Sequence, residues 1–158
     1  MKRDSQKTEF WIPMAGLFEI AKDAFFEDFR AELEQTEFAD IRPTHGCVFR
    51  FVKGGGLRLT ILAEMAGMTK QSVGEIVDDL VARGYVERIP DPDDKRAKII
   101  CLTERGERAQ ATGLALFAKV EKQWAKRYGA KRIAQARELL EEVAASEAPT
   151  AAPELSHV

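Results

Sequence analysis

Apolar residues recur at intervals of three and four over residues 14–33, which is the spacing of one face of a helix. The apolar positions are Met14, Leu17, Phe18, Ala21, Phe25, Phe29 and Leu33. Pro43 interrupts the helical pattern, and a second, shorter helix is predicted from Thr44 to Val52. The first third of the chain is therefore expected to form two helices, of which the first is long and amphipathic.

Two helices separated by a tight turn are predicted in the middle of the chain. Thr60 is expected to cap a short helix over residues 61–66, and Gly67 takes the turn that follows. Thr69 is expected to cap a longer helix that ends at Gly84, because glycine readily adopts the left-handed conformation. The inward-facing positions of this longer helix are Val73, Ile76, Val77, Leu80 and Val81. A helix, a tight turn and a second helix in this order form a helix-turn-helix.

A hairpin is predicted directly after the helix pair. Residues 85–89 and 98–102 have strand patterns, and the residues between them are the polar turn formers Pro90-Asp91-Pro92-Asp93-Asp94 and their neighbours. Before the helix pair, the glycines at 54–56 indicate a loop and residues 57–59 a brief strand. A hairpin that follows a helix-turn-helix is typical of a winged helix.

The last third of the chain is predicted to be helical as well. Thr103 is expected to cap a helix that Gly129 interrupts, and a final helix continues beyond the glycine. The apolar positions of the two helices are Leu114, Phe117, Val120, Trp124, Ile133, Ala136, Leu140 and Val143. The fold class expected is mainly α with a small antiparallel β-wing, in which a winged helix-turn-helix is flanked by long helices.

The composition is that of a globular protein, with 158 residues, 45% hydrophobic and 32% charged. No apolar run approaches the ~20 residues that span a bilayer, and the first ten residues have no signal-peptide character. We therefore expect a cytoplasmic protein with no membrane association.

The net charge of −2 does not by itself indicate nucleic-acid binding. Residues 1–43 carry six basic and ten acidic side chains, and residues 53–105 carry nine of each. Any interaction with DNA must therefore depend on where particular charges lie.

The start of the longer helix presents hydrogen-bonding side chains at Thr69, Lys70, Gln71 and Ser72. In a helix-turn-helix this end of the second helix contacts base edges in the major groove. Gln71 can pair with adenine, and Lys70 can reach a guanine edge or a phosphate. The acidic residues Glu75, Asp78 and Asp79 follow, so only the first turns are expected to enter the groove. A polar first turn is also what many helices have without any partner.

The hairpin tip carries a second candidate site at Asp94, Lys95 and Arg96. An arginine on an extended tip suits a narrow minor groove, where negative potential is concentrated. Asp94 is expected to orient the Arg96 guanidinium through a charge-assisted hydrogen bond. The alternative is an ordinary solvated turn.

No enzymatic chemistry is indicated by the residue pattern. No nucleophile has a base at a recognisable spacing, and the glycines at 54–56 lack the Lys-Ser/Thr of a nucleotide-binding loop. Cys47 and Cys101 have no metal-ligand spacing and are either buried apolar residues or redox-sensing thiols. No cofactor and no metal are expected.

The segment LAEMAGMTKQSVGEIVDDLVARGYVERIPDPDDKRAKIICLTERG resembles the core of the MarR family, the multiple-antibiotic-resistance regulators. The similarity is strong over residues 57–106, and the flanking helices match in length and order. The resemblance implies a homodimer that binds a pseudo-palindromic operator in double-stranded DNA, usually as a repressor. It places Lys70, Gln71 and Ser72 in the major groove and Arg96, held by Asp94, in the minor groove. A branch of the family senses peroxide through a cysteine in its first helix, a position where this chain has none.

The resemblance also implies a pocket for a small aromatic or phenolic acid effector. The candidate ligand-binding residues are Trp11, Phe18, Arg42, His45 and Arg50. An aromatic wall with a cationic group suits an aromatic carboxylate, although each of these residues could equally belong to the core or to a solvated surface.

The outer helices carry more apolar surface than a small winged helix can cover, so a second copy of the chain is their expected cover. A monomeric helical layer is the alternative.

The expected division of the chain is a flexible segment 1–12, dimerisation and ligand-pocket helices 13–53, a DNA-binding winged helix 54–103, dimerisation helices 104–146 and a disordered tail 147–158. The function expected is a DNA-binding transcriptional regulator, in particular a repressor released by an aromatic effector. The rival hypothesis is a winged-helix protein-interaction module that does not bind DNA.

Overall fold

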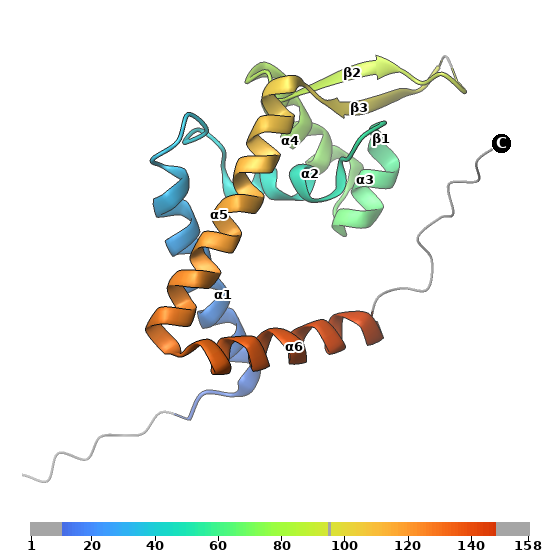
Figure 1. Ribbon diagram of the computed structural model, residues 1–158. Helices are drawn as coiled ribbons and strands as arrows, with labels where there is room; N and C mark the ends of the chain where they lie inside the picture. The colour runs from blue at the N-terminus through green and yellow to red at the C-terminus, as the bar shows by residue number, and fades with distance from the viewer. Residues whose placement is uncertain (1–10, 95, 148–158) are drawn as a thin grey trace, which may run out of the picture. The chain divides into compact units, whose positions relative to one another are not determined.

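The computed structural model describes residues 11–94 and 96–147, which form a mainly helical chain with one small sheet (Figure 1). The chain divides after Leu116 into two compact units. In chain order the elements are α1 (Met14–Leu33), the 3-10 turn η1 (Pro43–His45), α2 (Gly46–Phe51), β1 (Leu57–Arg58), α3 (Leu59–Ala66), α4 (Lys70–Ala82), β2 (Val86–Pro90), β3 (Lys98–Leu102), α5 (Glu104–Tyr128) and α6 (Ala130–Glu147). The expected fold class is confirmed.

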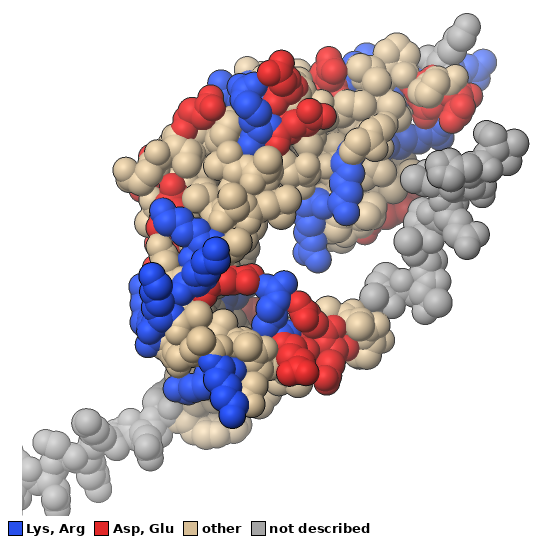
Figure 2. All heavy atoms as spheres, viewed as in Figure 1, with Lys and Arg blue, Asp and Glu red and all other residues tan. Residues whose placement is uncertain are grey.

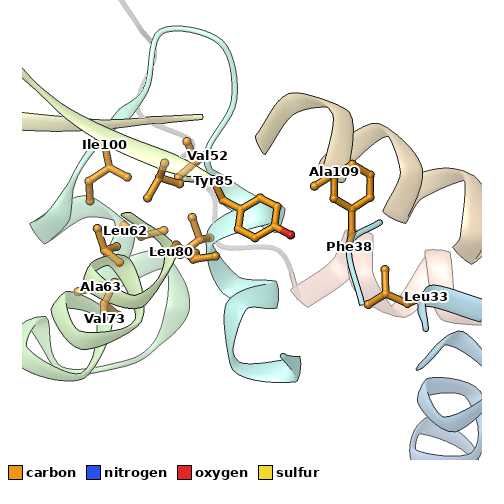
Figure 3. Packing of buried hydrophobic residues seen from close by; sticks show 13 residues of the cluster. Leu33, Phe38, Val52, Leu62, Ala63, Val73, Leu80, Tyr85, Ile100 and Ala109 are labelled. Atoms are coloured by element: carbon orange, nitrogen blue, oxygen red, sulfur yellow. The ribbon is translucent and has the colours of Figure 1, made fainter. Parts of the chain in front are cut away.

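The first unit has one continuous hydrophobic core beneath the sheet. Figure 3 shows Leu62 and Ala63 from α3 beside Val73 from α4, all of them buried. The small side chain of Ala63 suits a position where two helices lie against each other. The other fully buried members include Val48, Val52, Val77, Leu80, Tyr85 and Ile100. Burial of this kind contributes about 1.5–3 kcal/mol for each large apolar side chain, and it holds α3, α4 and the sheet as one body.

The sheet has three antiparallel strands in the order β1-β3-β2. Strands β2 and β3 pair from Val86 opposite Leu102 to Pro90 opposite Lys98, and β1 pairs with the other edge of β3. The predicted hairpin is therefore confirmed as a wing, and the brief strand predicted before the helix pair is its third strand.

The end of α4 explains why β2 begins one residue later than its pattern predicts. Gly84 is left-handed with a φ of 75° and donates its N–H to Val81, while Tyr85 donates to Leu80. These two hydrogen bonds form the Schellman arrangement, in which buried Tyr85 packs against the last turn of the helix. Tyr85 thus belongs to the helix end, and the strand starts at Val86.

Two of the three predicted threonine caps are confirmed, and the third is wrong. Thr69 accepts a hydrogen bond from the Ser72 N–H, and Thr103 accepts one from the Gly106 N–H. Helix α3 instead begins at Leu59 with Arg58 at its N-cap position, so Thr60 lies inside the helix. The physical reason is that Arg58 is held in the sheet opposite Ile99, which leaves no loop before the helix.

The second unit contains the rest of α5, the break at Gly129 that the sequence predicts, and α6. Arg137 of α6 donates to both carboxylate oxygens of Glu121 at 2.7 Å, which links the two helices. Helix α6 continues to Glu147, so the expected tail boundary at 147 is wrong by one residue. The segments 1–10 and 148–158, for which flexibility is predicted, lie outside the described residues. Within the described ranges, no helix is long and apolar enough to cross a membrane.

Candidate nucleic-acid interface

The start of α4 is exposed, and its four candidate residues have different partners. The hydroxyls of Thr69 and Ser72 lie 2.8 Å apart, and Thr69 also caps the helix. Gln71 makes only a long contact of 3.4 Å from its Nε2 to Glu75, while Lys70 forms no hydrogen bond or ion pair with the described residues. Lys70 and Gln71 are therefore the side chains most available to a ligand, whereas Thr69 and Ser72 mainly stabilise the helix end.

The wing tip is closed by two aspartates. Asp91 accepts a hydrogen bond from the Asp93 N–H, and Asp94 accepts one from the Arg96 N–H at 3.0 Å. Asp94 thus holds the main chain of Arg96 and shapes the turn, whereas the sequence predicts a hydrogen bond to the guanidinium. Arg96 is exposed, and Lys95 lies outside the described residues. The tip presents the Arg96 side chain without the expected carboxylate beside it.

Two of the three acidic residues of α4, Asp78 and Asp79, form ion pairs within the protein. Asp78 accepts a hydrogen bond from Arg88 of the wing at 2.6 Å. Asp79 lies 2.8 Å from the His45 ring nitrogen Nε2 and 3.0 Å from Arg83 Nε. The hydrogen bond from Arg83 and then that from His45 lower the pKa of Asp79. These carboxylates tie α4 to the wing and to η1, which explains their presence on a helix expected to face DNA.

His45 is a structural residue, with only 1% of its surface exposed. Its Nδ1 accepts a hydrogen bond from the Arg42 N–H, so the Nε2 nitrogen donates to Asp79 when the ring is neutral. Burial lowers the pKa of His45, against the opposite effect of Asp79. Both ring nitrogens are therefore occupied, and His45 offers nothing to an effector.

The other four predicted ligand-binding residues are not gathered around a cavity among the described residues. Trp11 and Phe18 are 81% and 53% exposed. Arg42 lies 3.8 Å from Asp79, and the guanidinium of Arg50 lies 5.0 Å from the Phe51 ring centre. The structure thus brings Arg42 and His45 together through Asp79 and leaves Trp11, Phe18 and Arg50 apart from them.

Both cysteines are half-buried and unpaired. Burial raises the pKa of each thiol, which disfavours the reactive thiolate. Their environment is that of small apolar residues.

A polar cluster that the sequence does not reveal joins α4 to α5. Asp40 accepts a hydrogen bond from the Tyr85 hydroxyl at 2.6 Å and lies 3.3 Å from Arg83 Nη1. Arg105 donates to the same hydroxyl and lies over the Tyr85 ring at 4.7 Å. The four residues come from sequence positions up to 65 apart, so no local pattern could have grouped them.

Five cationic side chains line one concavity of about 350 Å³ between the wing and the helix pair. The sequence predicts a DNA contact for Lys70 and Arg96, while Arg58, Arg88 and Lys98 are added by the structure. The remaining lining residues are apolar apart from one threonine. Figure 2 shows basic and acidic side chains interspersed over the winged-helix part in the view given, so this local concentration of cations is not a property of the whole surface.

A sequence model described as the MarR family matches residues 39–97. The transcriptional regulator HosA of Escherichia coli O111:H- is 29% identical over 91 residues, which cover 57% of this chain and 67% of HosA. HosA of E. coli O127:H6 is 28% identical over 98 residues, which cover 61% of this chain and 73% of that protein.

The solved structures that resemble this chain include the reduced form of MarR from E. coli, with a TM-score of 0.73 and 21% identity over 84% of this chain and 97% of MarR. The transcriptional repressor CouR, bound to a 23-mer DNA duplex, has a TM-score of 0.69 and 22% identity over 84% of this chain and 92% of CouR. At these identities the structural likeness establishes the fold, and the sequence matches add a likeness to the MarR family over part of the chain.

Over residues 39–97 the chain resembles the MarR family. The matched relatives are described as transcriptional regulators, and the winged-helix fold of this chain supports a DNA-binding regulator. The matched residues 39–97 include α3, α4 and β2 and end just before β3, so they contain the two elements that carry the candidate contacts.

Proposed function

We propose that the chain is a homodimeric transcriptional repressor that binds a pseudo-palindromic operator. In this proposal Lys70 and Gln71 contact base edges in the major groove, and Arg96 enters the adjacent minor groove. The observation that carries the proposal is that Lys70 and Arg96 line the same concavity from two different elements. The helix start and the wing tip can therefore contact one duplex at the same time.

Exposed apolar side chains support the homodimer. Phe18 of α1 and Leu140 of α6 are 53% and 52% exposed, and several neighbours on each helix are exposed as well. A symmetric second copy can cover the same surfaces on both chains. Two winged helices would then lie on half-sites about one helical turn apart.

Release by a small aromatic acid is the finer part of the proposal. Trp11 and Phe18 offer exposed aromatic rings, and Arg42 offers a cationic side chain that is 64% exposed. An effector acts only through its different affinity for the DNA-competent and DNA-incompetent states. A panel of aromatic acids should therefore both raise the melting temperature and release DNA. If no acid does either, the effector part of the proposal fails.

The direct test is a gel shift with DNA from upstream of the protein's own gene and from an unrelated sequence of equal length. The proposal expects salt-sensitive binding to both and tighter binding to the upstream DNA. The rival hypothesis, a winged helix that binds another protein, expects no binding to either duplex at low salt.

A further inference from the structure

The concavity between α4 and the wing is lined by cations from α4, from the wing tip and from all three strands of the sheet. Arg58 comes from β1, Arg88 from β2, Lys98 from β3, and Lys70 and Arg96 from the two elements expected to enter grooves. In the sheet Arg88 lies opposite Ile100, and Lys98 lies two residues before Ile100 on the same strand. Arg88 and Lys98 therefore share the face of the sheet on which Ile100 is buried, because side chains alternate along a strand.

The two grooves of a duplex are separated by a sugar–phosphate strand. If Lys70 reaches the major groove and Arg96 the adjacent minor groove, that strand must cross the concavity between them. We infer that this concavity is a cradle for the phosphodiester backbone, in which Arg58 and Lys98 contact phosphates and Asp78 restrains Arg88. This inference rests on the proposed function and adds three residues and a restraint to it.

The partners of the cradle cations give them different roles. Arg58 Nε lies 2.5 Å from Asp91, which is only 5% exposed, so Asp91 anchors Arg58 from the protein side. Arg88 lies 2.6 Å from Asp78, whose side chain is 67% exposed. A solvent-facing carboxylate beside Arg88 repels phosphate and competes with it for the guanidinium. Lys98 forms no hydrogen bond or ion pair with the described residues, so it supplies its full charge.

The restraint by Asp78 has a distinctive consequence. Asp78→Asn removes the competing carboxylate and frees Arg88, so the variant should bind any duplex more tightly than the wild type does. A substitution that only damaged the folded structure would weaken DNA binding, so binding tighter than that of the wild type distinguishes the two explanations. Asp78 thus limits sequence-independent affinity, and sequence-dependent contacts then decide where the protein binds.

The experiment measures the affinity of the full chain for a random duplex and for the upstream DNA over a series of salt concentrations. Lys98→Gln should make the slope of log affinity against log salt shallower by about 0.9 per protomer, which is about an eightfold loss at 0.1 M salt. The double variant Arg58→Gln with Asp91→Asn should give a similar change. It leaves the net charge unaltered and no buried carboxylate unpaired. Asp78→Asn should steepen the slope by up to about 0.9 per protomer.

Two matched controls make the same charge changes elsewhere in the same unit. Lys53→Gln removes a cation that lines a different concavity, and Glu64→Gln removes an exposed carboxylate on α3. Both should bind within about twofold of the wild type. The cradle would be overturned if Lys53→Gln and Lys98→Gln had equal effects on DNA binding. It would also be overturned if Lys98→Gln and the double variant kept the wild-type salt slope. Either result would leave the proposed function intact. A wild type that binds neither duplex overturns the proposed function first.

Small free oxyanions such as phosphate share the chemistry of the DNA phosphate group. The experiment must therefore distinguish binding of DNA from binding of a small anion in the same concavity. Thermal unfolding is measured with sodium phosphate against sodium chloride at equal ionic strength. The cradle expects equal melting temperatures, because an open concavity suits a chain of phosphates better than one small ion. A rise that Lys98→Gln abolishes, without any change in DNA slope, would assign the concavity to a small anion and contradict the inference.

Discussion

At the scale of single residues, Gln71 and Arg96 separate two ways of contacting DNA. Gln71 is uncharged and would act through base edges, so Gln71→Ala should cost about 1–3 kcal/mol per half-site on the best sequence. Its salt slope should hardly change. Arg96 would act through groove shape and potential, so Arg96→Ala should weaken binding to all related sequences and make the salt slope shallower. Fluorescence anisotropy over a salt series, with an operator and its mismatched variants, measures both quantities.

The control for this comparison is Glu64→Gln, an exposed position on α3 away from the concavity. Wild-type binding by Arg96→Ala across the salt series would show that the hairpin does not act as a wing. If Gln71→Ala lost the same affinity for matched and mismatched sequences, Gln71 would make no base-specific contact.

His45 gives a prediction about pH. Burial lowers the pKa of His45 in the folded chain, so the unfolded chain binds a proton at a higher pH than the folded chain does. Stability should therefore be fully present above the unfolded pKa of about 6.5 and fall as the pH decreases below it. His45→Asn should have lower stability at pH 7 and a flatter dependence between about pH 7 and 5.5.

Urea unfolding at several pH values measures this dependence, and the range above pH 5 avoids the titration of most carboxylates. The protein has two histidines, so His157→Asn is the matched control and should keep the wild-type dependence. An unchanged dependence in His45→Asn would contradict the role assigned to His45.

At the scale of elements, the start of α5 is fixed by its closeness to Tyr85. A side-chain carbon at Gly106 would overlap the Tyr85 carbonyl oxygen, whereas one at Gly113 on the same helix would meet nothing within 4 Å. Gly106→Ala should therefore destabilise the fold by several kcal/mol, about 2–5 by comparison with other severe core changes. Gly113→Ala should stabilise it by about 0.5–1 kcal/mol through its better helix propensity. Chemical denaturation of both variants measures the contrast, and equal effects would contradict the packing described here.

Most elements could be predicted because their determinants are local. Thr69, Thr103, Gly67 and Gly84 lie at helix ends where short-range hydrogen bonds and a left-handed backbone decide the structure. Thr60 looks like the same signal and is not a cap, because pairing of β1 with a strand forty residues later places the helix start at Leu59. Where tertiary pairing overrides local chemistry, the local pattern fails.

The candidate site could be predicted only where its residues are neighbours in sequence. Lys70 and Gln71 follow a helix cap, and Arg96 lies in a turn, so their exposure follows from local structure. Arg58 and Arg88 join them only through strand register, which the sequence does not specify. The sequence predicts a hydrogen bond from the Arg96 guanidinium to Asp94, whereas the structure shows one from the Arg96 main-chain N–H, because a turn and an ion pair share one sequence signature.

At the scale of the whole molecule, the small net charge of −2 is compatible with DNA binding because three aspartates near the candidate interface are paired with arginines. Asp78, Asp79 and Asp91 each contact an arginine within 3.0 Å. Their negative charge is therefore offset locally, while Lys70, Arg96 and Lys98 form no ion pair within the part of the chain that the structure describes. Distribution rather than total charge decides the interaction.

The oligomeric state gives the last prediction. On α6 the side chains of Leu139, Leu140 and Val143 are 57%, 52% and 50% exposed, a cluster of apolar surface that a second chain can cover. We expect a dimer at micromolar concentration by sedimentation. Because a symmetric interface contains each residue twice, Leu140→Asp should shift the dissociation constant by at least about tenfold. Gln135→Asp introduces the same charge at an exposed polar position of α6 and should leave the dimer intact. Leu140→Asp should also weaken binding to a palindrome far more than binding to a half-site, because linked half-sites gain from effective concentration. The wild type could instead prove to be a monomer and still bind a palindrome with the affinity expected of a dimer. That result would contradict both the proposed interface and the proposed operator symmetry.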